Sequence, residues 1–150
     1  MFPDAEVPVI PLSLQSRGGP QAAYQLGQAL APLTSRGFLV IASGNLTHNL
    51  RDYQRIHQTG GSTPTYVREF SDWIGEHLHR HDIPALLDYR RQAPGGVQAH
   101  PSDEHLLPLF VALVAAGEHA AAKRFHAGID DYVLAMDAWA AANPAATDAN

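Results

Sequence analysis

The sequence predicts an α/β protein in which a mixed sheet is flanked by helices. The first 42 residues contain a strand, an amphipathic helix and a second strand in that order, which is the pattern of a βαβ unit with a right-handed crossover. The second strand, residues 38–42, is a continuous apolar run, as expected for a strand that is covered on both faces. A chain of 150 residues is also long enough for one domain whose core needs no disulfide.

Proline and glycine mark the first elements of the chain. Residues 7–14 are rich in β-branched side chains, but Pro8 and Pro11 have no backbone N–H and restrict this strand to a sheet edge or a strand end. Apolar residues then recur at helical spacing from Gln21, and this helix ends near Gly37. These signals place the first helix between the two predicted strands.

Further helices are predicted in the middle of the chain. A Ser-Thr-Pro start signal followed by apolar residues at helical spacing predicts a helix over 62–80. Asp82 caps a short third helix that runs to about Tyr89. Pro108 fits only in the first turn of a fourth helix, because it lacks an N–H, and this places His105 at or just before the start of that helix.

The C-terminal part of the chain contains one more predicted strand. Residues 132–136 are β-branched, aromatic and apolar, which favours a strand. From Ala140 onward the composition changes to Ala, Asn, Pro and Asp, which is typical of a frayed end. We therefore assign residues 1–140 to one domain and residues 141–150 to a disordered tail.

Composition excludes several classes of partner and site. Fifteen acidic against ten basic side chains give a net charge of −5, so no basic stripe is available and we expect no nucleic-acid partner. Cysteine is absent, which excludes disulfides and thiolate metal ligands. No leader is recognised and no apolar run approaches the roughly 20 residues of a membrane span, so we expect a cytoplasmic protein without a membrane partner. Nine histidines remain for metal binding or proton transfer.

Two of these histidines are candidates for a site. His48 follows the second predicted strand, at the end where open α/β sheets bind ligands, and His105 precedes a helix. Binding and catalytic residues concentrate at such positions, so one histidine would ligate a metal and the other would be a ligand or a proton shuttle. Neighbouring side chains that could fix their tautomers are Asn45, Thr47 and Asn49. The alternative is that both are surface histidines, because their spacing says nothing about proximity.

Other groups have weaker signals. Glu104, beside His105, is either a carboxylate ligand or an acidic residue that stabilises a helix N-terminus. His77 and His81 have the spacing of two ligands on one helix face, but cations also suit the helix C-terminus where they fall. The glycine-rich phosphate motifs and the G-x-S-x-G motif of serine hydrolases are absent, so phosphate binding and serine hydrolysis are not supported.

Four blocks of the chain are similar to one enzyme family. They are residues 1–9 with 12–14, residues 41–51 (IASGNLTHNLR), residues 100–109 (HPSDEHLLPL) and residues 134–139 (LAMDAW). The blocks occur in the family's order across nearly the whole chain. On these residues the chain resembles the class III extradiol ring-opening dioxygenases of the LigB type, most closely the 4,5-DOPA dioxygenase group.

The resemblance implies a LigB-like extradiol dioxygenase fold, of which this chain would form the C-terminal half. It also implies one non-haem metal, Fe(II), with zinc in some members, and a catechol-type substrate that is cut next to its diol with O2. By the same match, His48 is the catalytic histidine that acts on the catechol proton, close enough to the metal to be counted as a ligand. His105 matches a metal ligand, with Glu104 as the alternative at that position.

The chain also departs from the family pattern. Family members are nearly twice as long, and their first half supplies two histidine ligands that this sequence does not reproduce. We therefore expect weak or no dioxygenase activity unless an N-terminal-half polypeptide or a symmetric copy in a homo-oligomer completes the site.

Alternatives to the enzyme remain open. One is a catalytically inactive half-domain that acts as an interaction or metal-binding module; another is an unrelated small α/β metal-binding protein that uses His77 and His81. Under the family interpretation, Arg51, Asn49 and Asp137 would support the site or the fold, and Asp137 favours a structural role.

Overall fold

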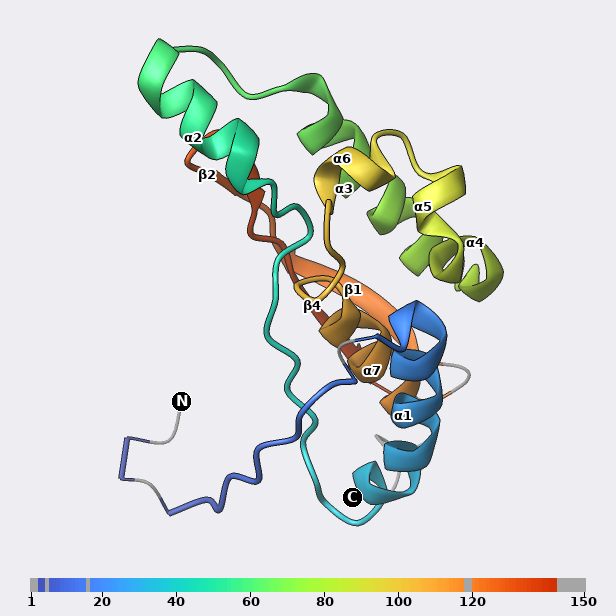
Figure 1. The fold of residues 1–150 in the computed structure, drawn as a ribbon. Helices are drawn as coiled ribbons and strands as arrows, with labels where there is room; N and C mark the ends of the chain where they lie inside the picture. The colour runs from blue at the N-terminus through green and yellow to red at the C-terminus, as the bar shows by residue number, and fades with distance from the viewer. Residues whose placement is uncertain (1–2, 5, 16, 118–119, 143–150) are drawn as a thin grey trace.

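The computed structural model describes residues 3–4, 6–15, 17–117 and 120–142 (Figure 1). Within these residues the helices come first along the chain and the short strands follow near its C-terminal end. The helices are α1 (Gly19–Thr34), α2 (Leu50–Thr59), α3 (Thr65–His79), α4 (Ile83–Leu87), α5 (Tyr89–Gln92), α6 (Gly96–Ala99) and α7 (Leu107–Ala115). The strands are β1 (Ala121–His126), β2 (Ile129–Asp130), β3 (Leu134–Ala135) and β4 (Ala138–Ala142).

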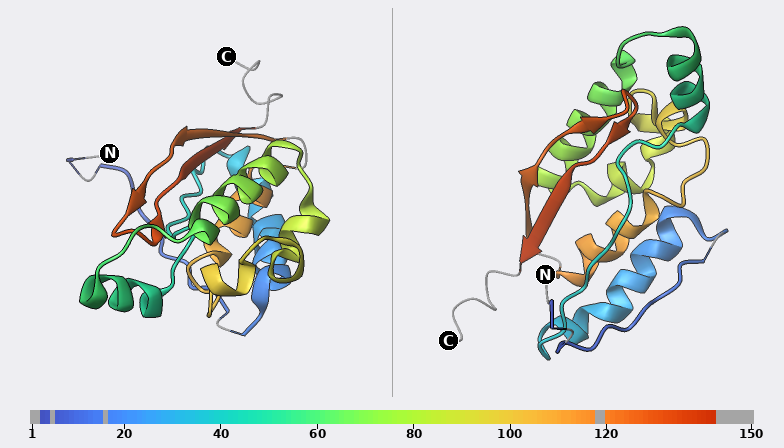
Figure 2. Two further views of the ribbon diagram at one scale, coloured as in Figure 1. Left: turned by 90° about the horizontal axis from the view of Figure 1, so that it is seen from above. Right: turned by 90° about the vertical axis from the view of Figure 1, so that its left-hand side faces the viewer.

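The core is built mainly from helices. Phe70 and Ile74 of α3 are fully buried and belong to one apolar cluster with Tyr89 and with Phe110 of α7. Helix α1 lies alongside α7 (Figure 2), and Gly27 allows this approach because a Cβ there would lie only 2.6 Å from the carbonyl oxygen of Val111. The apolar residues that recur at helical spacing in the sequence therefore form the buried faces of these helices.

The strands form two small antiparallel sheets. β1 pairs with β4, with Lys123 opposite Ala140 and an irregularity in register between Arg124 and His126. β2 pairs with β3 in a tight hairpin. β1 and β4 were not expected, since their alanine-rich sequences favour helix over strand. Tertiary packing overrides this preference, because Trp139 of β4 packs on α3 at Gly75 and lies beneath the Arg124 guanidinium.

Two predicted strands are wrong in the described structure. Residues 7–14 and 38–42 are extended, but neither segment pairs with another strand. The apolar run at 38–42 is not covered on both faces, since Leu39 is 69% exposed and Ile41 is 65% exposed. The physical reason is the lack of a neighbouring strand among the described residues, without which an apolar run cannot form the interior of a sheet. The βαβ unit is therefore not formed.

Other predictions are confirmed. The α/β class, with short sheets flanked by helices, holds, and the first, second and fourth predicted helices correspond to α1, α3 and α7. Asp82 caps α4 by accepting a hydrogen bond from the Ala85 N–H, and Pro108 lies in the first turn of α7. The predicted strand at 132–136 is reduced to β3.

The last described strand includes the first two residues of the predicted tail. β4 continues to Ala142, and residues 143–150 of the predicted tail lie outside the described residues. Over the part of the chain that the structure covers, we find no helix with the length and apolar character required to span a bilayer.

Candidate functional site

The structure brings His48 and His105 together. Their imidazole rings stack with centroids 3.6 Å apart and an angle of 28° between the ring planes. His48 lies just before α2 and His105 lies two residues before α7, so each comes from a connecting segment beside a rigid helix. Of the two interpretations drawn from the sequence, the one in which the pair shares a site agrees with this geometry.

Backbone contacts hold the two histidine segments against each other. The Asn45 N–H donates to the carbonyl oxygen of His105 at 3.0 Å, and the His48 N–H donates to that of Ala99 at 2.8 Å. Gly44 makes the first contact possible, because a Cβ at this position would collide with the His105 carbonyl oxygen. Residues 45–48 are thus hydrogen-bonded to residues 99–105 both before His48 and at His48 itself.

Thr47 joins the His48 segment to the C-terminal hairpin. Its buried hydroxyl donates to the Val133 carbonyl and accepts from the Ala135 N–H, both at 2.7 Å. The Leu46 N–H also donates to the Ala135 carbonyl at 3.0 Å. These bonds satisfy buried polar groups that would otherwise destabilise the fold, and they attach the site to β3.

The buried side chain of His100 is hydrogen-bonded to the segment that precedes His48. It is completely buried, and its Nε2 lies 2.7 Å from the Leu46 carbonyl oxygen. Since a carbonyl can only accept, Nε2 carries the proton in the neutral ring. Burial lowers the pKa of His100 to about 4, with the neighbouring His48 and His105 acting in the same direction. His100 is therefore an uncharged donor near neutral pH.

The charges at the site favour a neutral His48. Burial, and then the proximity of His105, lower the pKa of His48, while Glu104 opposes the shift. The Glu104 carboxylate accepts from the Ser102 hydroxyl at 3.0 Å and lies 3.9 Å from Nε2 of His105. Its own backbone N–H and the Ser102 hydroxyl lower the pKa of Glu104. The site therefore combines two imidazoles with one ionised carboxylate at its rim.

These donors fit part of a metal site. Imidazole and carboxylate are the ligands that non-haem iron and zinc take in proteins. Among the described residues, however, no group of three or more His, Cys, Asp or Glu side chains could hold a metal ion. The donor chemistry at His105 would therefore suit a non-haem metal, but the described residues bring together fewer than three such donors.

The expected helpers of His48 act on the backbone instead of on its ring. Asn49 caps α2 by accepting from the Arg51 and Asp52 N–H groups, both at 3.1 Å, and its amide donates to the Gln98 carbonyl. Thr47 bonds to the hairpin as described, so neither of these residues fixes the His48 tautomer through a hydrogen bond. The Arg51 side chain is exposed on α2.

Asp137 has the structural role that its sequence position favoured. Its carboxylate is almost completely buried and accepts from Arg124 at 2.9 Å and from the Ser71 hydroxyl at 3.1 Å. These two hydrogen bonds join β1 and α3 to the segment between β3 and β4. Asp137 is therefore satisfied by internal partners.

The alternative metal site at His77 and His81 is not supported. Helix α3 ends at His79, and His81 adopts a left-handed backbone with φ of 54°, so the two residues do not share a helical face. His77 stacks on Trp73 and places Nδ1 3.0 Å from the Trp73 carbonyl oxygen. The i, i+4 spacing was misleading because the helix ends between the two histidines.

Two residues at the site were not recognised from the sequence. They are His100 and Gly44. For His100, burial depends on long-range packing against α3, where its ring lies 5.7 Å from that of Phe70, and no local signal reports this. Gly44 could have been suspected, since glycine beside a site often permits close backbone approach.

Comparisons with known proteins show the family to which the chain is related. Residues 1–134 match the family model described as the catalytic LigB subunit of aromatic ring-opening dioxygenase. The chain is 35% identical over 139 residues to a 4,5-DOPA dioxygenase extradiol of Beta vulgaris, covering 93% of this chain and 51% of that protein. It is 33% identical over 121 residues to the protein of the same name from Escherichia coli K12, covering 75% of this chain and 42% of that protein.

A solved structure has a similar fold. The crystal structure of an uncharacterized protein from Escherichia coli K12 superposes with a TM-score of 0.79 at 30% identity, covering 93% of this chain and 57% of that one. The chain spans about half the length of the curated relatives it matches. The resemblance seen in the four sequence blocks is thereby confirmed, and the chain belongs to the LigB family of aromatic ring-opening dioxygenase catalytic subunits.

Proposed function

We propose that this chain carries the His48 and His105 portion of an extradiol dioxygenase site that opens a catechol-type ring with O2 and a non-haem metal. Fe(II) is the proposed metal, with zinc as the alternative occupant of the same site. The observation that carries the proposal is the stacking of His48 on His105 at 3.6 Å in a chain of this family. The 4,5-DOPA dioxygenases among the relatives suggest a catechol as the substrate class.

His105 is the proposed metal ligand, because its ring lies at the exposed side of the pair with a carboxylate beside it. A bound metal would supply Lewis acidity toward the diol and a position for dioxygen. Glu104 balances positive charge at this edge, and it is the second candidate for the ligand position. The carbonyl oxygen of His105 is held by the Asn45 N–H, so the backbone that presents the ligand does not depend on the metal.

His48 is the proposed general base. A ring kept neutral by burial has an unprotonated nitrogen that can accept the proton of a catechol hydroxyl. Its ring stacks on that of His105, the proposed metal ligand, which supports a role for both in one site. The hydrogen bonds of Thr47 and of the His48 N–H hold the backbone of the proposed base in one conformation. Less conformational entropy would then be lost when the base is oriented for proton transfer.

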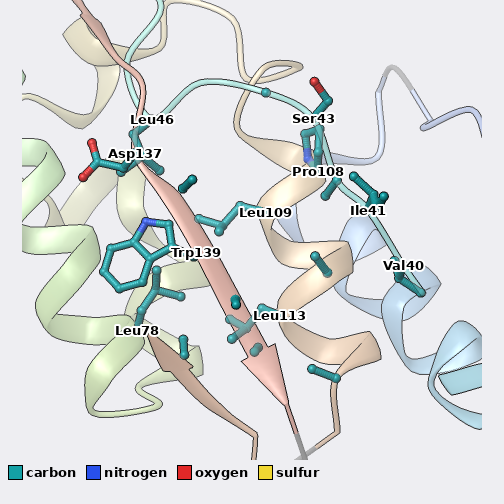
Figure 3. Close-up of a pocket in the computed structure, with 18 of the residues that line it drawn as sticks. Val40, Ile41, Ser43, Leu46, Leu78, Pro108, Leu109, Leu113, Asp137 and Trp139 are labelled. Atoms are coloured by element: carbon teal, nitrogen blue, oxygen red, sulfur yellow. The ribbon is translucent and has the colours of Figure 1, made fainter. Parts of the chain in front are cut away.

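The number of donors leads to a second part of the proposal. His105 and its neighbours supply too few ligands among the described residues, so ring opening requires a polypeptide that adds the others. The chain alone is then expected to be weakly active or inactive. The competing candidate, an interaction module without chemistry, is favoured by an open groove of mostly apolar lining between residues 39–44, α7 and β4 (Figure 3). It predicts no metal uptake under any condition.

The test is metal stoichiometry after anaerobic reconstitution with Fe(II), in this chain co-expressed with the unmatched part of the Beta vulgaris relative. We expect near one iron per assembled site, reduced to background by His105→Ala and unchanged by His79→Ala, an exposed histidine on α3. With catechol and O2, His48→Gln should retain iron but lose about 100-fold or more of the ring-opening rate. Iron retained in His105→Ala would contradict the assignment.

A further inference from the structure

Two consecutive residues at the end of α6 hold the backbone that leads to His48. The Ala99 carbonyl accepts from the His48 N–H at 2.8 Å, and Nε2 of His100 donates to the Leu46 carbonyl at 2.7 Å. All three partner residues, Leu46, Ala99 and His100, are buried. Because Ala99 and His100 are adjacent in the chain, a shift of the backbone at this point displaces both hydrogen bonds. The position of His48 is therefore coupled to that of His100.

The backbone of His100 is itself held by a side chain of α5, which packs beside α6 (Figure 1). Nη1 of Arg90 donates to the His100 carbonyl at 2.9 Å and to the Tyr89 hydroxyl at 3.3 Å. The same guanidinium lies 5.9 Å from the centroid of the Tyr89 ring, which is fully buried. His100 is thus hydrogen-bonded at two points, by its carbonyl to Arg90 and by its ring to Leu46.

The imidazole at position 100 costs free energy that an apolar side chain would not. Its ring lies among aromatic neighbours, with centroids 5.7 Å from Phe70 and 6.2 Å from Tyr89. Its Nδ1 is buried and has no hydrogen-bond partner among the described residues, and burial of an unpaired polar atom is unfavourable. What the ring provides, and an apolar residue at this position could not, is the donor to the Leu46 carbonyl.

We propose that Arg90 and His100 are positioning residues, which act on His48 through the Leu46 carbonyl and so maintain its stacking on His105. Arg90 fixes the His100 backbone, and the His100 ring fixes the peptide group two residues before His48. A displacement of His100 would change the 3.6 Å separation of the stacked rings without removing either ring. The consequence for catalysis rests on the proposed function, whereas the geometry of the pair does not.

The first test measures the stacking of the two imidazoles in the chain without metal, by NMR at about pH 8.5, where free imidazoles are neutral. Stacked rings shift each other's carbon-bound protons upfield, so the His48 and His105 ring protons report their separation. We expect most of this shift to disappear in His100→Leu and to be retained in His100→Gln, which can donate to the same carbonyl. Arg90→Gln should reduce the shift in the same direction. Arg91→Gln, at an exposed residue of α5, should leave it unchanged.

A matched core variant separates positioning from a general loss of stability. Phe70→Leu removes a buried ring beside His100 but no hydrogen bond of the site. Like His100→Leu, it should lower the free energy of unfolding in urea, but it should leave the shifts of the stacked imidazoles unchanged. Should His100→Leu fail to fold, Arg90→Gln still decides the question, because Arg90 is only partly buried.

A second test concerns catalysis and uses the iron-loaded complex with which the proposed function is tested. Arg90→Gln should lower kcat about tenfold at an unchanged KM and iron content, because a misplaced base slows proton transfer. Changed ring-proton shifts with an unchanged rate would overturn the catalytic role. Unchanged shifts in both His100→Leu and Arg90→Gln, or an equal change in Phe70→Leu, would overturn the inference as a whole. Changed shifts in a complex that takes up no iron would refute the proposed function and leave the positioning of the pair standing.

Discussion

The segment that leads to α2, residues 39–49, has two halves that differ in their backbone hydrogen bonds. The anchored half, residues 45–49, is tied by hydrogen bonds to Ala99, His105 and the β2–β3 hairpin. The open half, residues 39–44, has no backbone hydrogen bond among the described residues. The chain's own hydrogen bonds thus hold the backbone around His48 and His105, whereas the described residues provide no strand that pairs with residues 39–44.

The largest expected effect separates the packed core from the open groove. Phe110→Ala removes a buried ring that is 1% exposed on α7, and it should lower the free energy of unfolding by about 3–5 kcal/mol. Phe125→Ala removes a ring that is 67% exposed and should change it by less than about 0.5 kcal/mol in the chain alone. Urea unfolding measures both values. Similar losses for the two variants would show that the groove is closed in solution.

A second test concerns acid stability of the anchored half. Because burial lowers the pKa of His100 from 6.5 to about 4, the unfolded chain binds a proton between these pH values that the folded chain does not. Stability therefore falls as pH decreases from about 6.5 to 4, by about 3 kcal/mol for this group. His100→Gln, which can still donate to the Leu46 carbonyl, should remove this part of the pH dependence. An unchanged slope in the variant would exclude His100 as its source.

The sequence predicted what local signals specify. Helical periodicity gave α1 and α3, the cap at Asp82 was correct, and Pro108 located the start of α7 and thus His105. The apolar run at 38–42 was misinterpreted because its burial depends on neighbours that the described chain does not provide. An apolar run shows that a segment is suited to the interior of a sheet, but it does not show that neighbouring strands are present.

The site was predictable only in part for the same reason. The positions of His48 and His105 at element ends indicated that they were candidates, but their stacking is a long-range contact that the spacing could not give. The buried roles of His100 and Thr47 follow from packing against α3 and from the β2–β3 hairpin. Family resemblance provided the pairing that physical patterns alone left open.

An intermediate effect is expected at Thr47. Thr47→Val removes a hydroxyl that serves both the Val133 carbonyl and the Ala135 N–H, and leaving these buried groups unpaired should cost about 1–3 kcal/mol. Thr47→Ser retains the hydroxyl and should recover most of this loss. Ser43→Ala, on the exposed open half, is the matched control and should have little effect. Urea unfolding gives the order, and equal losses at positions 43 and 47 would contradict the division into two halves.

The smallest effect is expected where the anchored half enters α2. Asn49→Ala removes the acceptor that caps the Arg51 and Asp52 N–H groups and the donor to the Gln98 carbonyl, and it should cost about 1 kcal/mol. Asn49→Ser keeps a cap acceptor but not the amide donor, so its loss should lie between the wild-type and alanine values and measure the Gln98 contact. Hydrogen exchange at the first turn of α2 should rise in Asn49→Ala. If serine were as destabilising as alanine, the contact to Gln98, and not the helix cap, would account for the contribution of Asn49 to stability.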